Sequence, residues 1–267
     1  MPEVSQQLFL GTDQVFAFYD NKWSGINSYN QSTGVITDQL VLRLDCTETT
    51  SYPGSGSKWN DISGNGNVAS ITGSLSFASS SLVFNNNTSN FIQMPHSSTY
   101  SVFDGDFTID HWITVDAFVT VAVNDIIGFY FKGSTNVEAN PGFGARMDRN
   151  TNAANFGKGF FLGNGTSTPT FDYFTNDNAS MVARKWYNIQ IVRSGSTVKL
   201  YSNTVEKQSG SPFSGNFNNT QPLTIGKYNN ASYGPWEGKI GTFLIYDKAL
   251  STTELTQNYN YYSTKFL

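Results

Sequence analysis

The segment LVLRLDCTETTSYPGSGSKWNDISGNGN (Leu40–Asn67) begins as a strand and continues as a long series of turn residues, and this combination indicates the fold. Leu40, Leu42 and Leu44 share one face of the first six residues, with a valine and an arginine between them. A period of two is the pattern of a strand that buries one face. The segment therefore predicts a β-strand that leads directly into an extended loop.

The loop is expected to follow a tight course along the core. Pro53, Gly54 and Gly56 favour a turn, and we expect the indole of Trp59 to cover an edge of the core. From Asp61 to Asn67, polar side chains alternate with glycines, which adopt positive φ without steric cost. We interpret the segment first as a structural signature of the fold and only second as a binding element.

Short strand patterns continue along the chain, nearly all bounded by glycine, asparagine, serine or proline: SLVFN, FIQMP, FTIDHWITVDAF, DIIGFYFKG, GFFLGNG, WYNIQIVRSG, TVKLYSNT, LTIGKY and GKIGTFLIYD. Many short strands separated by turns are typical of an antiparallel sandwich of jelly-roll type and not of a parallel α/β sheet. In FTIDHWITV, alternation leaves Trp112 and Asp110 on one face. The other face carries Phe107, Ile109, His111 and Ile113.

One helix is predicted, near the end of the sequence. Ser251 and Glu254 have the spacing of a capping box, in which each side chain bonds to the backbone of the other residue. The stretch ALSTTELTQNYNYY then supports about two helical turns. The predicted fold class is all-β: an antiparallel jelly-roll β-sandwich with a short C-terminal helix and an N-terminal extension.

The chain divides into two parts. In residues 1–38, QQLFLGTDQVFAFYDNKW indicates a strand or two, and SGINSYNQSTGVITD is polar and rich in turn residues. This part is interpreted as an anchoring arm. Residues 39–267 carry the regular strand pattern and form the predicted jelly-roll domain.

Composition and charge exclude several classes of function. The net charge is −4, and the 16 lysines and arginines are scattered, so the basic patch that binds phosphate backbones is missing and nucleic acid is not an expected partner. No apolar run approaches the roughly 20 residues that cross a bilayer, and the N-terminal residues lack the pattern of a signal peptide. Cys46 is the single cysteine, which argues against a disulfide-stapled secreted scaffold.

Aromatic residues raise the question of sugar binding. Tyr228, Tyr233 and Trp236 lie among glycine, proline and asparagine in NNASYGPWEGK, an apparent loop, and we predict that they contact a ligand. The other tryptophans are expected to be core residues. His96 and His111 are the only histidines and do not suffice for a zinc site.

The order of these motifs resembles the concanavalin A-like lectin/glucanase family in its laminin-G-like form, over about residues 38–260. The matching stretches are TDQLVLRLDCTETTSYPGSGSKWNDISGNGN, SLVFNNNTSNFIQMP, FTIDHWITV, KWYNIQIVRSGSTVKLYSN and EGKIGTFLIYDKALSTTELTQNYN. The opening SYPGSGSKWNDISGNGN more narrowly resembles virion proteins of tailed bacteriophages, especially those of cyanobacteria. The resemblance implies a sandwich carried on a fibre or on a capsid surface.

Members of this family often hold calcium, which the resemblance assigns to Asp61 and Asn65. Side-chain oxygens do alternate from Asp61 to Asn67, but the glutamate that an EF-hand requires is missing. We interpret the loop first as an Asx-turn, which satisfies its own backbone, and keep the calcium site as the alternative. Rival oxygen clusters lie at residues 104–106 and at Glu237 with Asp247.

Catalysis is not expected. The glucanase branch uses paired carboxylates in a Glu-x-Asp-x-x-Glu motif, and none of the six glutamates of this chain forms it. A Gly-x-Ser-x-Gly elbow before a helix is also missing. The sequence therefore predicts a non-catalytic protein.

The predicted function is a phage virion structural protein, either a capsid decoration or head fibre or a tail fibre component, that displays a lectin-like jelly roll. The expected partners are other virion proteins, reached through the N-terminal arm, and host-surface polysaccharide; an oligomer on the particle is also expected. Without an export signal, synthesis in the host cytoplasm and release by lysis fit this location. A free bacterial carbohydrate-binding module or adhesin is the alternative, and fold alone does not decide between them.

Overall fold

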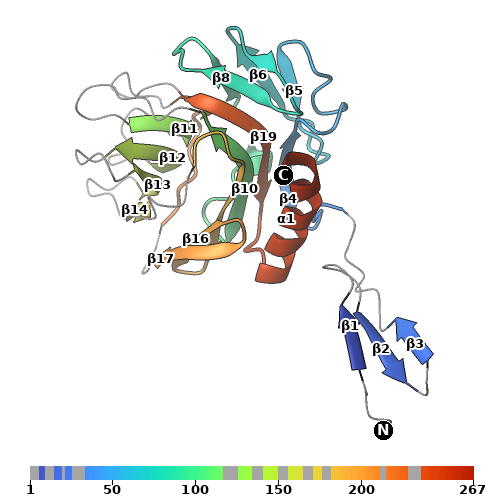
Figure 1. Ribbon diagram of the computed structural model, residues 1–267. Helices are drawn as coiled ribbons and strands as arrows, with labels where there is room; N and C mark the ends of the chain where they lie inside the picture. Colours follow the sequence, from blue (N-terminus) through green and yellow to red (C-terminus); the bar gives the residue numbers. More distant parts are fainter. Residues whose placement is uncertain are drawn as a thin grey trace.

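The computed structural model describes eleven parts of the chain: residues 6–9, 15–19, 22–25, 34–116, 126–133, 141–149, 156–164, 171–175, 182–210, 215–227 and 236–267. They form two eight-stranded antiparallel sheets, a separate three-stranded sheet and one α-helix. The two large sheets stack as a sandwich (Figure 1). The predicted all-β class is confirmed.

The front sheet is the layer built around β10. Its strand order is β17-β16-β15-β10-β19-β8-β7, and β4 also pairs with β19. The bounds are β4 (Leu40–Asp45), β7 (Ser76–Phe77), β8 (Leu82–Asn85), β10 (Phe107–Val115), β15 (Tyr187–Ser194), β16 (Thr197–Ser202), β17 (Val205–Gly210) and β19 (Glu237–Tyr246).

The back sheet forms the other layer, with the order β14-β13-β12-β11-β18-β9-β6-β5. The bounds are β5 (Lys58–Asn60), β6 (Val68–Thr72), β9 (Phe91–Met94), β11 (Ile126–Lys132), β12 (Pro141–Arg149), β13 (Phe156–Asn164), β14 (Phe171–Thr175) and β18 (Leu223–Ile225). A short 3₁₀ helix, η1 (Ser98–Tyr100), follows β9.

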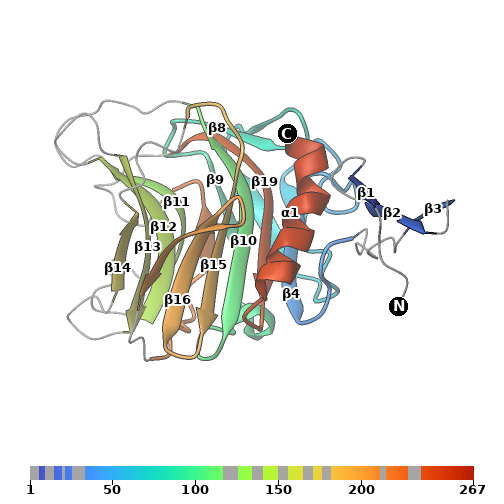
Figure 2. The ribbon, with the colours of Figure 1, turned by 60° about the horizontal axis from the view of Figure 1, so that its bottom comes forward.

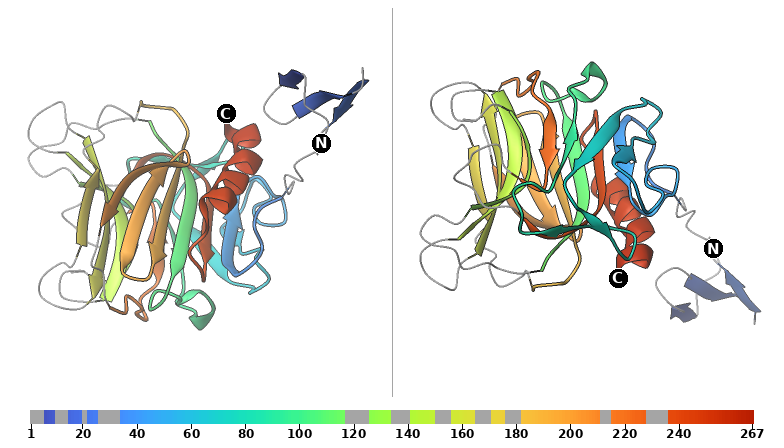
Figure 3. Two further views of the ribbon diagram at one scale, coloured as in Figure 1. Left: turned by 90° about the horizontal axis from the view of Figure 1, so that it is seen from below. Right: turned by 90° about the horizontal axis from the view of Figure 1, so that it is seen from above.

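The third sheet lies in the N-terminal arm. Its strands are β1 (Gln6–Phe9), β2 (Val15–Tyr19) and β3 (Lys22–Gly25), and β2 is the central one. The described strands of this sheet pair only with one another, and Figures 1 and 3 draw them apart from the sandwich. The arm therefore contains a sheet of its own.

Two hydrophobic cores hold the sandwich together. The larger fills the space between the sheets, and the side chains of Phe107, Ile109 and Ile113 belong to it, as alternation along β10 predicts. Trp112 belongs to a second core on the outer face of the front sheet. Helix α1 (Thr252–Phe266) covers that face (Figure 2). All nine residues of β10 are consequently buried.

Helix α1 begins with the predicted capping box. Ser251 accepts a hydrogen bond from the backbone N–H of Glu254, and the Glu254 carboxylate accepts one from the backbone N–H of Ser251. The helix has 15 residues, twice the predicted two turns. The helix runs past Tyr262, the last residue of the predicted stretch, because Phe266 continues the buried stripe of the second core.

His111 lies inside the larger core, on the inner face that alternation predicts. Its ring makes edge contact with Tyr130 at 5.1 Å between centroids and lies 5.9 Å from Phe243. The side chain is 1% exposed, and burial lowers the pKa of His111 to about 3. The imidazole is therefore neutral in the folded protein at every pH well above 3.

We predict that His111 makes the fold acid-sensitive. Between pH 6.5 and 3 the unfolded chain protonates this residue and the folded chain does not, so acidification lowers the free energy of unfolding by up to about 1.4 kcal/mol per pH unit. His111→Phe keeps an aromatic ring in the cluster and removes this titration. Urea unfolding of both proteins at pH 4 and pH 7 measures the difference, and equal pH dependence in the two proteins would contradict the prediction.

Candidate functional site

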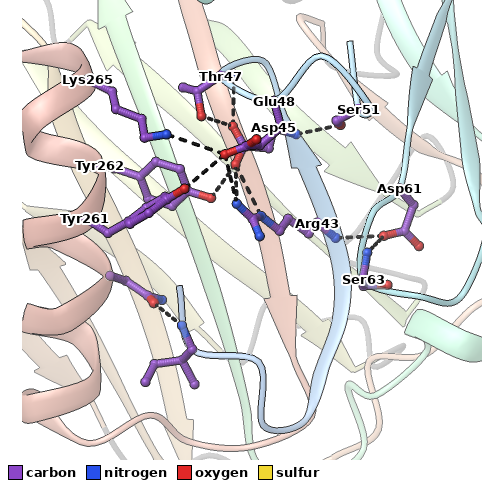
Figure 4. Close-up of polar contacts among 12 residues, drawn as sticks. Arg43, Asp45, Thr47, Glu48, Ser51, Asp61, Ser63, Tyr261, Tyr262 and Lys265 are labelled. Atoms are coloured by element: carbon purple, nitrogen blue, oxygen red, sulfur yellow. Dashed lines mark hydrogen bonds and ion pairs between the residues drawn. The ribbon is translucent and has the colours of Figure 1, made fainter. Parts of the chain in front are cut away.

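The loop that follows β5 covers the free edge of β4. β4 pairs with β19 along one edge, and the loop lies along the other. The Asp61 carboxylate accepts a hydrogen bond from the backbone N–H of Arg43 at 2.9 Å. In return, the backbone N–H of Ile62 donates to the carbonyl of Arg43 at 3.0 Å. Figure 4 shows Asp61 and Ser63 on this side of the strand.

Two further side chains complete the cover. The hydroxyl of Ser63 donates to the carbonyl of Val41 at 3.2 Å, and the amide of Asn65 donates to the same oxygen at 2.9 Å. Gly64 and Gly66 have φ values of 104° and 69°, which glycine adopts readily. Unpaired strand edges recruit other strands, so these bonds close β4 to further pairing. This is the reason for the alternating polar and glycine residues.

The same contacts decide how well a calcium ion would fit. One oxygen of Asp61 also accepts the backbone N–H of Ser63 at 2.8 Å, which is the predicted Asx-turn, and the other accepts the amide of Asn67 at 2.8 Å. Calcium binds oxygen ligands, but here N–H donors occupy both carboxylate oxygens and Asn65 turns its N–H group inward. Within the described residues, no group of three His, Cys, Asp or Glu could hold a metal. The geometry does not fit an ion at Asp61 and Asn65.

We predict that Asp61→Ala destabilises the fold by about 2 kcal/mol, because it leaves buried N–H groups without an acceptor. Ser55→Ala, which removes an exposed hydroxyl in the turn before β5, is the control and is expected to change stability by less than about 0.5 kcal/mol. Chemical unfolding with and without calcium measures both effects. Stabilisation of the native protein by calcium that disappears in both Asp61→Ala and Asn65→Ala would instead place an ion in this loop.

The side chain of Asp45, the last residue of β4, joins this strand to helix α1. The Asp45 carboxylate is fully buried and accepts hydrogen bonds from Arg43 at 2.8 Å, from the Thr47 hydroxyl at 2.7 Å and from the phenol of Tyr262 at 2.7 Å. Burial, and next the charge of Asp45, raises the pKa of Tyr262, so its phenol stays protonated and donates. Sequence reasoning misses this contact because Asp45 and Tyr262 lie 217 positions apart.

A second contact joins the end of α1 to the turn after β4. The Glu48 carboxylate accepts a hydrogen bond from the phenol of Tyr261 at 3.0 Å and pairs with Lys265 at 3.4 Å (Figure 4). These groups are partly exposed, so the ion pair contributes little stability. The polar groups around β4 therefore bind one another and fasten the loop and the helix to the strand.

Another polar centre lies at one end of the back sheet. The ammonium of Lys132, the last residue of β11, is fully buried and donates to the carbonyls of Asn219 at 2.7 Å and Gln221 at 2.8 Å. Burial lowers the pKa of Lys132 to about 8. His96 lies 3.4 Å from the same ammonium. Lys132 thus holds the segment before β18 against the end of β11.

Of the three aromatic residues predicted to bind a ligand, the structure describes only Trp236. Tyr228 and Tyr233 lie outside the described residues. The prediction for Trp236 is wrong: its side chain is 1% exposed, stacks on Phe84 at 4.9 Å and donates from Nε1 to the carbonyl of Thr114 at 3.1 Å. An indole enclosed in this way has no face left for a sugar.

The sequence contains a signal for this burial. Trp236 directly precedes β19 and has the same parity as Gly238 and Ile240, so extending the strand alternation back by two residues places the indole in the core. A Cβ on Gly238 would come within 2.5 Å of Nε1 of Trp236 and 2.1 Å of the Thr114 carbonyl oxygen. Glycine at position 238 therefore allows the indole to reach its acceptor.

Comparison with known proteins agrees with this architecture. Residues 86–256, well over half of the chain, match the family described as the concanavalin A-like lectin/glucanases superfamily, in its laminin-G form. The chain belongs to this superfamily. A comparison with curated proteins finds no match.

Among solved structures, three toxin structures show the same fold. The binding domain of Paraclostridial Mosquitocidal Protein 1 has a TM-score of 0.60 and 20% identity, covering 85% of this chain and 53% of that one. The binding domain of botulinum neurotoxin DC, in complex with rat synaptotagmin II, has a TM-score of 0.62 and 15% identity, and the match covers 84% of this chain and 52% of that one. A structure of botulinum neurotoxin type C, whose cell entry is described as dependent on two ganglioside molecules, has a TM-score of 0.62 and 17% identity. The match covers 84% of this chain and 51% of that one.

This chain spans about half the length of these toxin structures, and the low identities establish a shared fold alone. The fold is thus a lectin-like jelly roll. Among the described residues, no helix is both long and apolar enough to span a bilayer.

Proposed function

We propose that this chain is a non-catalytic structural protein of a bacteriophage virion, a capsid decoration, head fibre or tail fibre component, that displays a lectin-like jelly roll to the host surface. The observation that carries the proposal is the two-part architecture. A sheet in the arm, β1–β3, pairs with no described strand of the sandwich, while the sandwich closes its own cores. Such a division suits a protein with one end for attachment and one for display.

The arm is the proposed contact with other virion proteins. β1 and β3 form the two outer strands of the arm sheet, and outer strands offer unpaired N–H and C=O groups to another sheet. The resemblance of Ser51–Asn67 to virion proteins of tailed phages points to the same context. Assembly of several copies on one particle would also raise the avidity of a weak ligand site.

Host-surface glycan is the proposed ligand of the sandwich. The superfamily is lectin-like, and one toxin structure of the same fold is described through its dependence on gangliosides. Tyr228 and Tyr233 remain the proposed contact residues, because aromatic rings in a loop stack on the apolar faces of sugars. The lack of the Glu-x-Asp-x-x-Glu motif supports binding without hydrolysis.

A free bacterial carbohydrate-binding module or adhesin is the second candidate. The family match begins at residue 86 and ends at residue 256, so it lies wholly within the sandwich and leaves the arm unassigned. A module that acts alone would bind polysaccharide equally well without the arm. The two candidates therefore differ in what the arm does.

The particle role predicts that the full-length chain co-purifies in stoichiometric amounts with intact phage from its native source, as measured by mass spectrometry. Ala17→Pro in the full-length chain should abolish this association, because proline in central strand β2 removes a ladder donor. Ala17→Val preserves strand propensity and is the matched control. A chain absent from particles, or an Ala17→Pro variant that still assembles, would favour the free module.

The glycan role predicts binding on an array of bacterial surface polysaccharides. Tyr228→Ala and Tyr233→Ala are each expected to weaken that binding about tenfold, as loss of an aromatic anchor does at other interfaces. Val205→Ala removes an exposed side chain of β17 and is the control, with no expected change. Binding that both tyrosine variants retain in full would contradict the assignment of the loop.

A further inference from the structure

Residues 34–38 connect the arm to β4, and they pack against the sandwich. Although the sequence pattern groups them with the arm, the side chain of Val35 is 7% exposed and belongs to the core beneath α1. Ile36 also packs on that core. The segment is therefore part of the sandwich in its contacts.

Side chains of α1 and β19 bind the backbone of this segment directly. The backbone N–H of Ile36 donates to Oδ1 of Asn258 at 2.9 Å, and the carbonyl of Ile36 accepts from the phenol of Tyr246 at 3.1 Å. Two residues before Ile36, the carbonyl of Gly34 accepts a hydrogen bond from the side-chain amide of Gln257 at 2.9 Å. Three backbone groups within three residues are thus paired with side chains more than 200 positions away.

Asn258 connects this segment to the centre of the front sheet. Its side chain is fully buried, and its amide donates to the phenol oxygen of Tyr246 at 2.9 Å and to the carboxylate of Asp110 at 3.1 Å. Asp110 lies on β10 and also accepts hydrogen bonds from Asn188 at 2.6 Å and Gln190 at 3.2 Å. The contacts run without a break from Ile36 through Asn258 to β10 and β15.

We propose that α1 acts as a clamp that fixes the path of residues 34–38, with Asn258 as the positioning residue. Holding backbone residues in one conformation costs conformational entropy, and the hydrogen bonds to Asn258, Tyr246 and Gln257 offset that cost here. Residues 34–38 are consequently held against the sandwich as a fixed segment. This inference does not depend on what the arm or the sandwich binds.

Lys248 and Asp38 add a weaker contact at the other end of the clamped segment. The ammonium of Lys248 lies 2.7 Å from the carboxylate of Asp38 and 2.8 Å from that of Glu254. Asp38 is well exposed, so the pair contributes little and is not expected to replace the bonds of Asn258. The clamp therefore depends on the bonds that Asn258 and Gln257 of α1 make to the segment.

Amide hydrogen exchange on the full-length protein, followed by NMR, tests the clamp. The Ile36 amide should be protected in the native protein, and Asn258→Ala should accelerate its exchange about tenfold or more, because its acceptor is lost. Asn260→Ala, on the same helix, is the matched control and should leave Ile36 unchanged. An Ile36 amide that exchanges at the unprotected rate in the native protein would overturn the proposal.

A second variant distinguishes release of residues 34–38 from a loss of stability of the whole sandwich. Gln257 is only half-buried, and among the described residues its side chain bonds to Gly34, so Gln257→Ala should fold normally and still accelerate Ile36 severalfold. The amides of Ile109 and Ile191, in β10 and β15, should keep their native rates in that variant. Unchanged exchange at Ile36, or equal acceleration of the β10 and β15 amides, would show that α1 does not clamp the segment.

Discussion

β19 is the strand on which both cores of the sandwich depend. It pairs with β10 along one edge and with β4 and β8 along the other, so it joins the early and the middle parts of the chain. Its side chains also divide between the two cores: Phe243 and Ile245 point between the sheets, while Leu244 and Tyr246 meet the helix that follows. A change in this strand therefore acts on the interior of the sandwich and on the packing of α1 together.

Local patterns predict the parts of this fold that a single element determines. The inward face of β10 and the capping box at Ser251 follow from the order of neighbouring residues. The enclosure of Trp236 depends instead on Phe84 and Phe129, which belong to other strands. The sandwich is predictable because its periodicity is local, whereas the parity of Trp236 gives the direction of its indole but not the rings from other strands that enclose it.

The role of Asp61 and Asn65, the candidate metal ligands, also depends on partners that lie far away in the sequence. Alternating oxygens from Asp61 to Asn67 are compatible with an ion or with an Asx-turn, and the sequence leaves both open. The choice depends on the N–H of Arg43, which lies 18 positions earlier and occupies the carboxylate. Asp110 and Lys132 are likewise surrounded by partners from other elements. These buried polar groups are engaged by those partners and fix the positions of the strands.

The closed edge of β4 also has a consequence for the behaviour of the protein at high concentration. On that side the N–H of Arg43 is engaged by Asp61 and its carbonyl by Ile62, and the carbonyl of Val41 is engaged by Ser63 and Asn65. Misdirected edge-to-edge stacking of sandwiches, the usual route from a soluble β-protein to an aggregate, is blocked at this strand. Sandwiches that approach one another side by side can then do so without their β4 edges fusing into one continuous sheet.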